Sequence, residues 1–273
     1  MTLRSGPIAI TGANGRIGAA LRRRLAGFAT EARPLGRGDD LAAAFRDAEV
    51  VVHLAGTLRP EPPNTYVEAN LRTVERTVSA LEGSSVERIV FLSYVGADLC
   101  SSNEYLRAKG LAEELLRSCG RDVVVFRCSH VYGPPEDPGP TAEAFLAKNG
   151  RAARVLGSGR QRVAPVFRED VVEAIVRAAL DSTTYHGRYD LTGPEELTAD
   201  EFALALNGGH ATLRHVQPRL ARALARIVPG LPPALAEVML ADSVGDRIRA
   251  PRAFGLELRT VAEVYPLRER AAA

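Results

Sequence analysis

Short apolar runs alternate with helical patterns through the first two-thirds of the chain, and this alternation limits the possible folds more than any other feature. The runs are rich in β-branched residues and occupy residues 7–11, 49–54, 86–93 and 123–127. Strands that are apolar on both faces are typical of parallel sheets covered by helices on both sides. With right-handed crossovers the simplest topology is a doubly wound parallel sheet, so the sequence predicts an α/β fold.

The composition excludes several other classes of protein. The 35 basic and 33 acidic side chains among 273 residues give a net charge of +2, which offers no electrostatic reason to bind nucleic acid or an anionic membrane. No apolar run reaches the ~18 residues that a membrane span needs, and residues 1–12 lack a secretory leader, so we expect a cytoplasmic protein. Three cysteines without metal-ligand spacing predict neither a disulfide framework nor a metal site.

A glycine-rich turn follows the first predicted strand. Glycine occupies every third position of the segment Gly12-Ala13-Asn14-Gly15-Arg16-Ile17-Gly18, and a helical stretch begins there. In such a turn the first glycine permits the tight bend, the second lets a phosphate approach the backbone, and the third lets the helix pack on the strand. Backbone N–H groups at this helix start would face a pyrophosphate, which predicts a dinucleotide-binding site.

Tyr105 and Lys109 stand one turn apart on a predicted helix, residues 103–118. They share one face of it, because side chains at i and i+4 are neighbours. The chain has 33 arginines but only two lysines, Lys109 and Lys148, so a lysine at this position indicates a specific need. Its compact ammonium can donate to ribose hydroxyls and lower the pKa of a neighbouring phenol. A phenol, with an ordinary pKa of about 10, needs such help to exchange protons near neutrality.

With these motifs the chain resembles the short-chain dehydrogenase/reductase superfamily, in its extended or atypical branch. In detail it is similar to the group that includes the NAD(P)-binding accessory subunit of respiratory complex I. The matching segments extend over nearly the whole chain: residues 11–18, 53–56, 70, 91–93, 105–109, 127–134, 165–171 and 189–194. The resemblance implies a Rossmann fold with a smaller, mostly helical substrate lobe, and it implies no particular substrate.

The resemblance also implies roles for the catalytic residues. Tyr105 would be the general acid/base, Lys109 would hold the nicotinamide ribose and tune Tyr105, and Ser93 would position the substrate carbonyl. An alternative alignment puts Tyr94 in the place of Ser93, and the sequence leaves both open.

The same comparison implies a set of residues that contact or support the cofactor. Asn70 would support the strand behind the cofactor channel, which Ala55 and Gly56 would line. The full predicted set is Gly12, Asn14, Gly15, Arg16, Ile17, Gly18, Arg37, Leu54, Ala55, Gly56, Asn70, Leu92, Tyr105, Lys109, Cys128 and Val131.

The alternation breaks after Tyr132, where a segment rich in glycine and proline, residues 133–140, excludes regular structure. Helical patterns return at 141–149, at 169–180 and in the tail from residue 219. We predict a dinucleotide-binding Rossmann domain formed by residues 1–132 with 166–192. Residues 133–165 with 193–273 would form a substrate-binding lobe over the carboxyl ends of the strands, where ligands bind in open α/β folds.

The end of a weaker strand predicted at residues 28–35 favours NADP(H), with NAD(H) left open. No acidic residue stands there to accept hydrogen bonds from both ribose hydroxyls of NAD. Arg37 can instead pair with a 2′-phosphate, and Arg16 could reach the same phosphate from the glycine turn. In the alternative, both arginines are solvated and Asp39 or Asp40 folds back to the ribose.

Together these features predict an NAD(P)-dependent oxidoreductase that transfers a hydride between nicotinamide and a small or medium carbonyl or alcohol substrate. A sugar-nucleotide epimerase or dehydratase would use the same tyrosine and lysine, but it needs a diphosphate site, for which Arg162 is out of register. A non-catalytic, cofactor-binding structural or assembly protein is a third hypothesis, and the intact Tyr105 and Lys109 argue against it. We expect a small-molecule substrate as the partner and leave open whether the chain forms a homodimer.

Overall fold

A six-stranded parallel sheet lies at the centre of the protein, in the strand order β10-β5-β4-β3-β1-β2. The computed structural model describes residues 3–61, 63–147, 151–183 and 185–266. The strands of the sheet are β1 (Ile8–Thr11), β2 (Ala32–Leu35), β3 (Val50–His53), β4 (Arg88–Tyr94), β5 (Asp122–Cys128) and β10 (Gly187–Leu191). The predicted doubly wound parallel sheet is confirmed.

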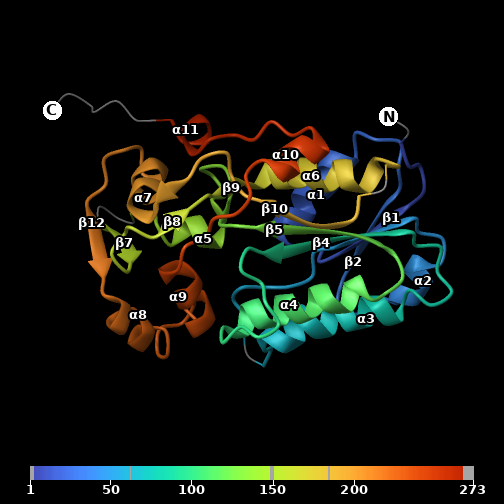
Figure 1. Ribbon diagram of the computed structural model, residues 1–273, viewed down its shortest axis with the longest axis horizontal. Coiled ribbons are helices and arrows are strands. Elements are labelled where there is room, and N and C mark those ends of the chain that lie inside the picture. The colour runs from blue at the N-terminus through green and yellow to red at the C-terminus, as the bar shows by residue number, and fades with distance from the viewer. Residues whose placement is uncertain (1–2, 62, 148–150, 184, 267–273) are drawn as a thin grey trace.

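Helices cover both faces of this sheet, as Figure 1 shows. One face carries α1 (Arg16–Leu25), α6 (Arg168–Leu180) and α10 (Arg249–Phe254), and the other carries α3 (Thr73–Ser79) and α4 (Glu104–Arg117). The short helix α2 (Leu41–Phe45) follows β2, and a π-helical stretch, η1 (Val67–Arg72), precedes α3. Each face has its own apolar cluster, because the strands between them are apolar on both sides.

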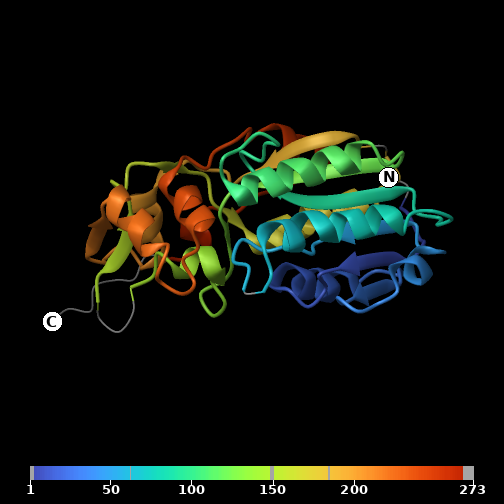
Figure 2. The same ribbon diagram turned by 90° about the horizontal axis from the view of Figure 1, so that it is seen from below.

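A second group of elements lies at one end of the sheet, on the left of Figure 2. It has an apolar cluster of its own, which includes Tyr132, Phe145, Phe202, Leu235 and Met239. Its strands pair two by two: β6 (Val131–Tyr132) with β9 (Val166–Phe167), β7 (Ala153–Leu156) with β12 (Leu213–Val216), and β8 (Arg162–Val163) with β11 (Leu197–Thr198). Its helices are α5 (Gly139–Glu143), α7 (Ala199–Leu206), α8 (Pro218–Leu224), α9 (Pro233–Leu240) and α11 (Val261–Val264).

The structure departs from the predicted elements in this second group. The helix expected at 141–149 is α5, which begins at Gly139, inside the segment predicted to be irregular, and ends at Glu143. Pro140 does not prevent it, because a proline in the first helical turn replaces an N–H that has no partner there. Residues 148–150 lie outside the described residues.

The division into two domains stays a prediction. Helix α10, which lies within the segment predicted to belong to the substrate lobe, packs against the sheet instead. Ala250 and Phe254 of α10 belong to the apolar cluster between the sheet and α6, and Phe254 lies edge-on to Phe126 of β5. This part of the tail therefore returns to the sheet.

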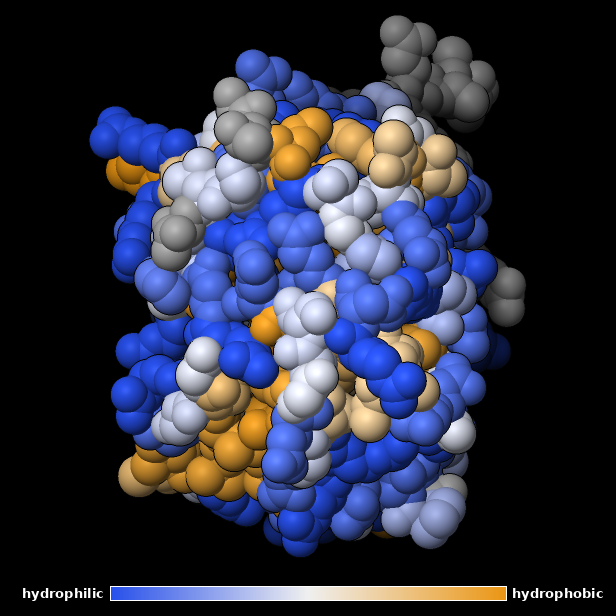
Figure 3. All heavy atoms as spheres, turned by 90° about the vertical axis from the view of Figure 1, so that its right-hand side faces the viewer, coloured by the Kyte–Doolittle hydropathy of each residue, from blue (hydrophilic) through white to orange (hydrophobic). Residues whose placement is uncertain are grey.

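The end of the molecule opposite the second group is mostly hydrophilic, with an apolar area near one lower edge (Figure 3). Among the described residues, no helix is both long enough and apolar enough to cross a membrane.

Candidate functional site

The glycine turn between β1 and α1 packs too closely for side chains at two of its three glycines. Gly12 has a φ of +69°, and a Cβ there would lie 2.7 Å from the amide nitrogen of Ala55. A Cβ at Gly18 would lie 2.5 Å from the carbonyl oxygen of Gly12. At Gly15 the nearest atom is 3.3 Å away, so the outer side of the turn stays open. A cradle of bare backbone thus forms at the start of α1, as a pyrophosphate requires.

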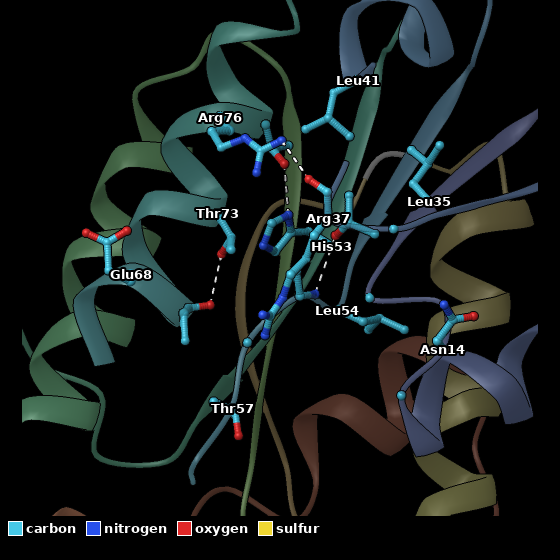
Figure 4. Close-up of a pocket in the computed structure, with 18 of the residues that line it drawn as sticks. Asn14, Leu35, Arg37, Leu41, His53, Leu54, Thr57, Glu68, Thr73 and Arg76 are labelled. Atoms are coloured by element: carbon cyan, nitrogen blue, oxygen red, sulfur yellow. Dashed lines mark hydrogen bonds between the residues drawn. The ribbon is translucent and has the colours of Figure 1, made fainter. Parts of the chain in front are cut away.

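A cavity of about 530 Å³ opens beside this turn, between the ends of β1, β2 and β3 and the stretch η1–α3 (Figure 4). Seven of the predicted cofactor residues line it: Gly12, Asn14, Gly15, Arg37, Leu54, Ala55 and Gly56. The other lining residues, which are not in the predicted cofactor set, are Thr11, Leu35, Gly36, Leu41, His53, Thr57, Asn64, Glu68, Ala69, Thr73, Arg76 and Thr77.

His53 presents an unpaired nitrogen in this region. Its Nδ1 lies 3.0 Å from Oγ1 of Thr77, while its buried Nε2 has no hydrogen-bond partner among the described residues. Burial lowers the pKa of His53 to about 3, with Lys109 adding to the effect, so the ring is neutral. His53 therefore adds a neutral polar group to the wall of the cavity.

Beyond the end of β2 the cavity is lined by the side chains of Arg37 and Arg76. The two aspartates that follow β2, Asp39 and Asp40, are not among its lining residues. Arg76 of α3 donates to the carbonyl oxygen of Arg37 at 3.2 Å, and both residues line the cavity. The carboxylate of Asp39 accepts from the amide of Gly36 at 2.7 Å, and that of Asp40 caps α2 through Ala43 at 3.1 Å. Each carboxylate thus accepts one backbone hydrogen bond and keeps further acceptor sites, so the alternative in which one of them meets the ribose stays open.

Arg16 points elsewhere than expected. It pairs with Asp137 at 2.8 Å and lies 3.6 Å from Glu143, and the carboxylate of Asp137 also binds Arg168. Arg16 does not line the cavity. The expectation that it faces a 2′-phosphate is therefore corrected: two acidic residues from the second group of elements hold it at the outer side of α1.

Tyr105 and Lys109 lie on α4, whose first turn is capped by Asn103. Lys109 donates from Nζ to the carbonyl oxygen of Leu92 at 2.9 Å, and its ammonium lies 4.8 Å from the centre of the Phe91 ring. Burial lowers the pKa of Lys109 to about 8. Nζ is also 3.2 Å from where a Cβ of Gly56 would be, which brings Lys109 to the edge of the cavity.

Two tyrosine rings pack around the phenol of Tyr105. The rings of Tyr66 and Tyr94 lie edge-on to it, at centroid distances of 6.0 Å and 5.7 Å. Burial, followed by the charge of Tyr94, raises the pKa of Tyr105 above its ordinary value. Lys109 was expected to lower this pKa; in the structure its ammonium is directed at Leu92 and Phe91, so burial dominates and the phenol stays protonated.

Ser93 faces away from Tyr105. Its hydroxyl donates to Glu113 at 2.5 Å, and the same carboxylate binds Arg127 at 2.8 Å, in a buried cluster between α4 and the sheet. Tyr94, one residue on, points to the other side of β4, because side chains alternate along a strand. The geometry thus favours the alternative alignment, in which Tyr94 lies next to Tyr105.

The hydroxyl of Tyr94 is held by two further buried groups. It lies 2.7 Å from Nδ1 of His130 and 3.0 Å from the hydroxyl of Ser243. Burial lowers the pKa of His130 to about 4, and its Nε2 has no partner within the described part of the chain.

Asn70 fixes the loop after β3. Its carbonyl oxygen accepts from the amide of Thr57 at 3.1 Å, and its amide donates to the carbonyl oxygens of Thr57 and Tyr66. A Cβ at Gly56 would lie 2.7 Å from Oδ1 of Asn70, so only glycine fits between this side chain and the cavity. Asn70 supports the loop from behind rather than lining the cavity.

The remaining predicted residues lie in the packing below the site. Ile17, Leu92 and Val131 are partly buried against the apolar cluster of the sheet, and Cys128 is fully inside it. None of the four lines the cavity. No group of three or more potential metal ligands exists among the described residues.

Comparison with known proteins gives a family. The model of the NAD dependent epimerase/dehydratase family matches residues 8–189, about two-thirds of the chain. Among curated proteins, NADH dehydrogenase (ubiquinone) 1 alpha subcomplex subunit 9 of Arabidopsis thaliana is 29 % identical over 167 residues, which cover 60 % of this chain and 41 % of that protein. The chain thus spans about two-fifths of the length of this relative.

A second relative matches almost the whole chain. A ceramide reductase of Caulobacter vibrioides is 26 % identical over 275 residues, 92 % of this chain and 82 % of that protein.

Solved structures share the fold at low identity. MoeE5, solved with UDP-glucuronic acid and NAD, has a TM-score of 0.76 at 20 % identity, over 96 % of this chain and 97 % of its own. A UDP-glucuronic acid 4-epimerase of Bacillus cereus has a TM-score of 0.72 at 17 % identity, over the same shares of the two chains.

Proposed function

Because the chain belongs to the NAD dependent epimerase/dehydratase family, we propose that it is an NAD(P)-dependent oxidoreductase of the cytoplasm that reduces the carbonyl group of a small or medium substrate. One observation carries this proposal. Tyr105 and Lys109 occupy successive turns of α4, and Lys109 borders Gly56 at the edge of the dinucleotide cavity. An acid and a cation so placed suit proton transfer next to a bound dinucleotide.

The residues of the cavity fit a nicotinamide dinucleotide. The bare backbone at Gly12 and Gly15 would hold the pyrophosphate, and Ala55 and Gly56 would lie along the cofactor. Lys109 spends one of its three donors on Leu92, which leaves two for ribose hydroxyls. The nicotinamide, when bound, supplies or accepts the hydride.

Tyr105 would supply the proton in this reaction. The phenol is protonated at neutral pH, so it can donate to a carbonyl oxygen during reduction, and the same oxygen would take the proton back in the reverse reaction. Tyr94, held by His130 and Ser243, would pack against the acid and fix its ring.

We also propose a preference for NADP(H). Arg37 and Arg76 line the cavity beyond β2, whereas Asp39 and Asp40 are bound to backbone amides. A 2′-phosphate would meet two guanidinium groups at this place. The family description and the solved neighbours name NAD, so the preference rests on these side chains alone.

The Tyr105→Phe variant tests the reaction. We expect it to fold and to bind cofactor as the unmodified protein does, and to lose turnover by about 10²–10⁴-fold on carbonyl substrates, because positioned acid catalysis contributes about that much. Tyr66→Phe is the matched control, since its hydroxyl bonds only the carbonyl oxygen of Leu58 in the same cluster. If Tyr105→Phe keeps full activity on a substrate that the unmodified protein reduces, Tyr105 is not the catalytic acid.

A sugar-nucleotide epimerase is the first competing function, and the solved neighbours with UDP-sugars favour it. Against it, Arg162 is occupied by Glu196 at 3.0 Å and lies 3.9 Å from Asp242. We expect no cofactor-dependent rise in melting temperature with UDP- or TDP-sugars. A rise of several degrees would favour the epimerase.

A non-catalytic subunit is the second competing function. The relative from Arabidopsis thaliana is named as a subunit of NADH dehydrogenase, and α9 lies over Tyr105 in this structure, with Ala234 and Val238 in the same apolar cluster. Tight cofactor binding without turnover across a panel of aldehydes, ketones and enones would favour this function over the reductase.

A further inference from the structure

Helix α8 and the turn after it expose a line of apolar side chains. Leu220, Ile227 and Val228 are 54 %, 76 % and 40 % exposed, and Ile227 is the most exposed large apolar side chain in the described part of the protein. The amides of Ile227 and Val228 both donate to the carbonyl oxygen of Leu224, so the helical path continues beyond α8. Leu220 and Ile227 are therefore two turns apart on one side.

The opposite side of this segment is anchored. Ala221 and Ala225 are buried in the apolar cluster of the second group of elements. This packing fixes which way the segment faces, so Leu220 and Ile227 are turned outward by the fold and do not lie in a mobile tail.

The charge of the same region is one-sided. No aspartate or glutamate occurs between Glu201 and Glu237, a stretch that contains Arg214, Arg219, Arg222 and Arg226. Arg222 pairs with Glu237 at 2.7 Å, whereas the other three arginines have no acidic partner among the residues that the structure describes. Arg219 and Arg226 are also two turns apart, which sets them in a row beside the apolar line.

We propose that the α8 surface, formed by Arg219, Leu220, Arg226, Ile227 and Val228, docks the protein onto an anionic lipid bilayer. The apolar side chains would enter the headgroup region while the arginines bind lipid phosphates, the pattern of an interfacial helix. Figure 1 places α8 at the end of the molecule away from the sheet, where a flat surface can reach it. The net charge of +2 is an average over the chain and does not reveal this local excess of arginine.

Sedimentation with lipid vesicles tests this proposal independently of the proposed catalytic activity. We expect the full chain to sediment with vesicles of equal parts phosphatidylcholine and phosphatidylglycerol, and to stay in solution with phosphatidylcholine alone. The double variant Arg219→Gln, Arg226→Gln should bind the anionic vesicles about thirtyfold more weakly, since each basic residue near such a surface contributes about 1 kcal/mol. Ile227→Asn should weaken binding by about tenfold or more.

Two matched controls separate the α8 surface from general effects. The pair Arg22→Gln, Arg23→Gln removes the same charge from the exposed side of α1, and Leu99→Asn removes an apolar side chain that is 50 % exposed. Both should bind the anionic vesicles as the unmodified chain does. Absence of binding by the unmodified chain, or an equal loss in the controls, would overturn the proposal. So would a vesicle-free dimer that Ile227→Asn dissolves, because the apolar line would then belong to a contact between two copies.

Discussion

Lys109 is buried in a chain that otherwise uses arginine, and its surroundings explain the choice. Its ammonium fits between the carbonyl oxygen of Leu92, the ring of Phe91 and the bare backbone of Gly56. A guanidinium is larger and planar, and it keeps its charge when buried. Burial lowers the pKa of Lys109 to about 8, so its ammonium group gives up a proton more readily than that of an exposed lysine.

Arg37→Ala tests the proposed cofactor preference. We expect affinity for NADPH to fall at least tenfold and affinity for NADH to change little, because a hydrogen bond to a charged group contributes about 1.5–3 kcal/mol. Calorimetric titration of both cofactors measures this. Arg46→Ala, exposed at the end of α2 and outside the cavity lining, is the matched control. Tighter binding of NADH by the unmodified protein, or equal weakening of both cofactors, would contradict the preference.

The residues of the site differ in how far the sequence alone can predict them. Tyr105 and Lys109 were predictable because four positions on a helix fix their relation locally. Ser93 and Tyr94 were not separable, because a shift of one residue along β4 exchanges its faces and only the packing of Glu113 decides. Arg76 left no signal, because it reaches the cavity from a helix far along the chain.

The glycines of the turn between β1 and α1 are needed for different reasons, Gly15 for the approach of a phosphate and Gly18 for packing. Alanine substitutions distinguish these two roles. Gly15→Ala should fold normally, since its φ of −70° suits alanine and its nearest contact is 3.3 Å. It should nevertheless weaken cofactor binding by about tenfold or more, because the new methyl group occupies the phosphate side.

Gly18→Ala should instead lower the free energy of unfolding by about 1–3 kcal/mol, since its methyl group would be forced against the backbone of the turn. Gly38→Ala, which meets nothing within 4 Å, is the control for both variants. Denaturant unfolding and cofactor titration of the three proteins measure these effects. Equal loss of stability for Gly15→Ala and Gly18→Ala would show that the second glycine serves packing rather than ligand approach.

Elements with several residues of one period were predicted well, and the strands of two residues were not. Residues 103–118 were expected as a helix and α4 is Glu104–Arg117, with Asn103 capping it. The pairs β6–β9 and β8–β11 contain two residues in each strand, too few for any period to appear. Their position follows from the tertiary packing of the second group of elements, which no local pattern encodes.

For the whole molecule, two buried histidines link stability to pH. Burial lowers the pKa of His53 to about 3 and that of His130 to about 4, so both rings stay neutral in the folded chain. Between pH of about 6.5 and 4 the unfolded chain binds a proton at each of these positions and the folded chain does not. The free energy of unfolding should therefore fall as the pH falls through this window, by about 1.4 kcal/mol per pH unit for each histidine.

Denaturant unfolding at neutral pH and near pH 5 measures this dependence. The difference between the two conditions should be smaller in His53→Asn than in the unmodified protein. If His53→Asn keeps the full difference, the ring of His53 is already protonated in the folded state.

Helix α9 seals Tyr105 from the side of the second group of elements. Ala234 and Val238 share its apolar cluster, and Asn103, which caps α4, donates to the carbonyl oxygen of Ala234 at 2.9 Å. Asn103 thus both caps α4, which carries Tyr105, and binds α9, which covers Tyr105. The start of α4, where the acid lies, and the position of α9 are therefore coupled through a single side chain.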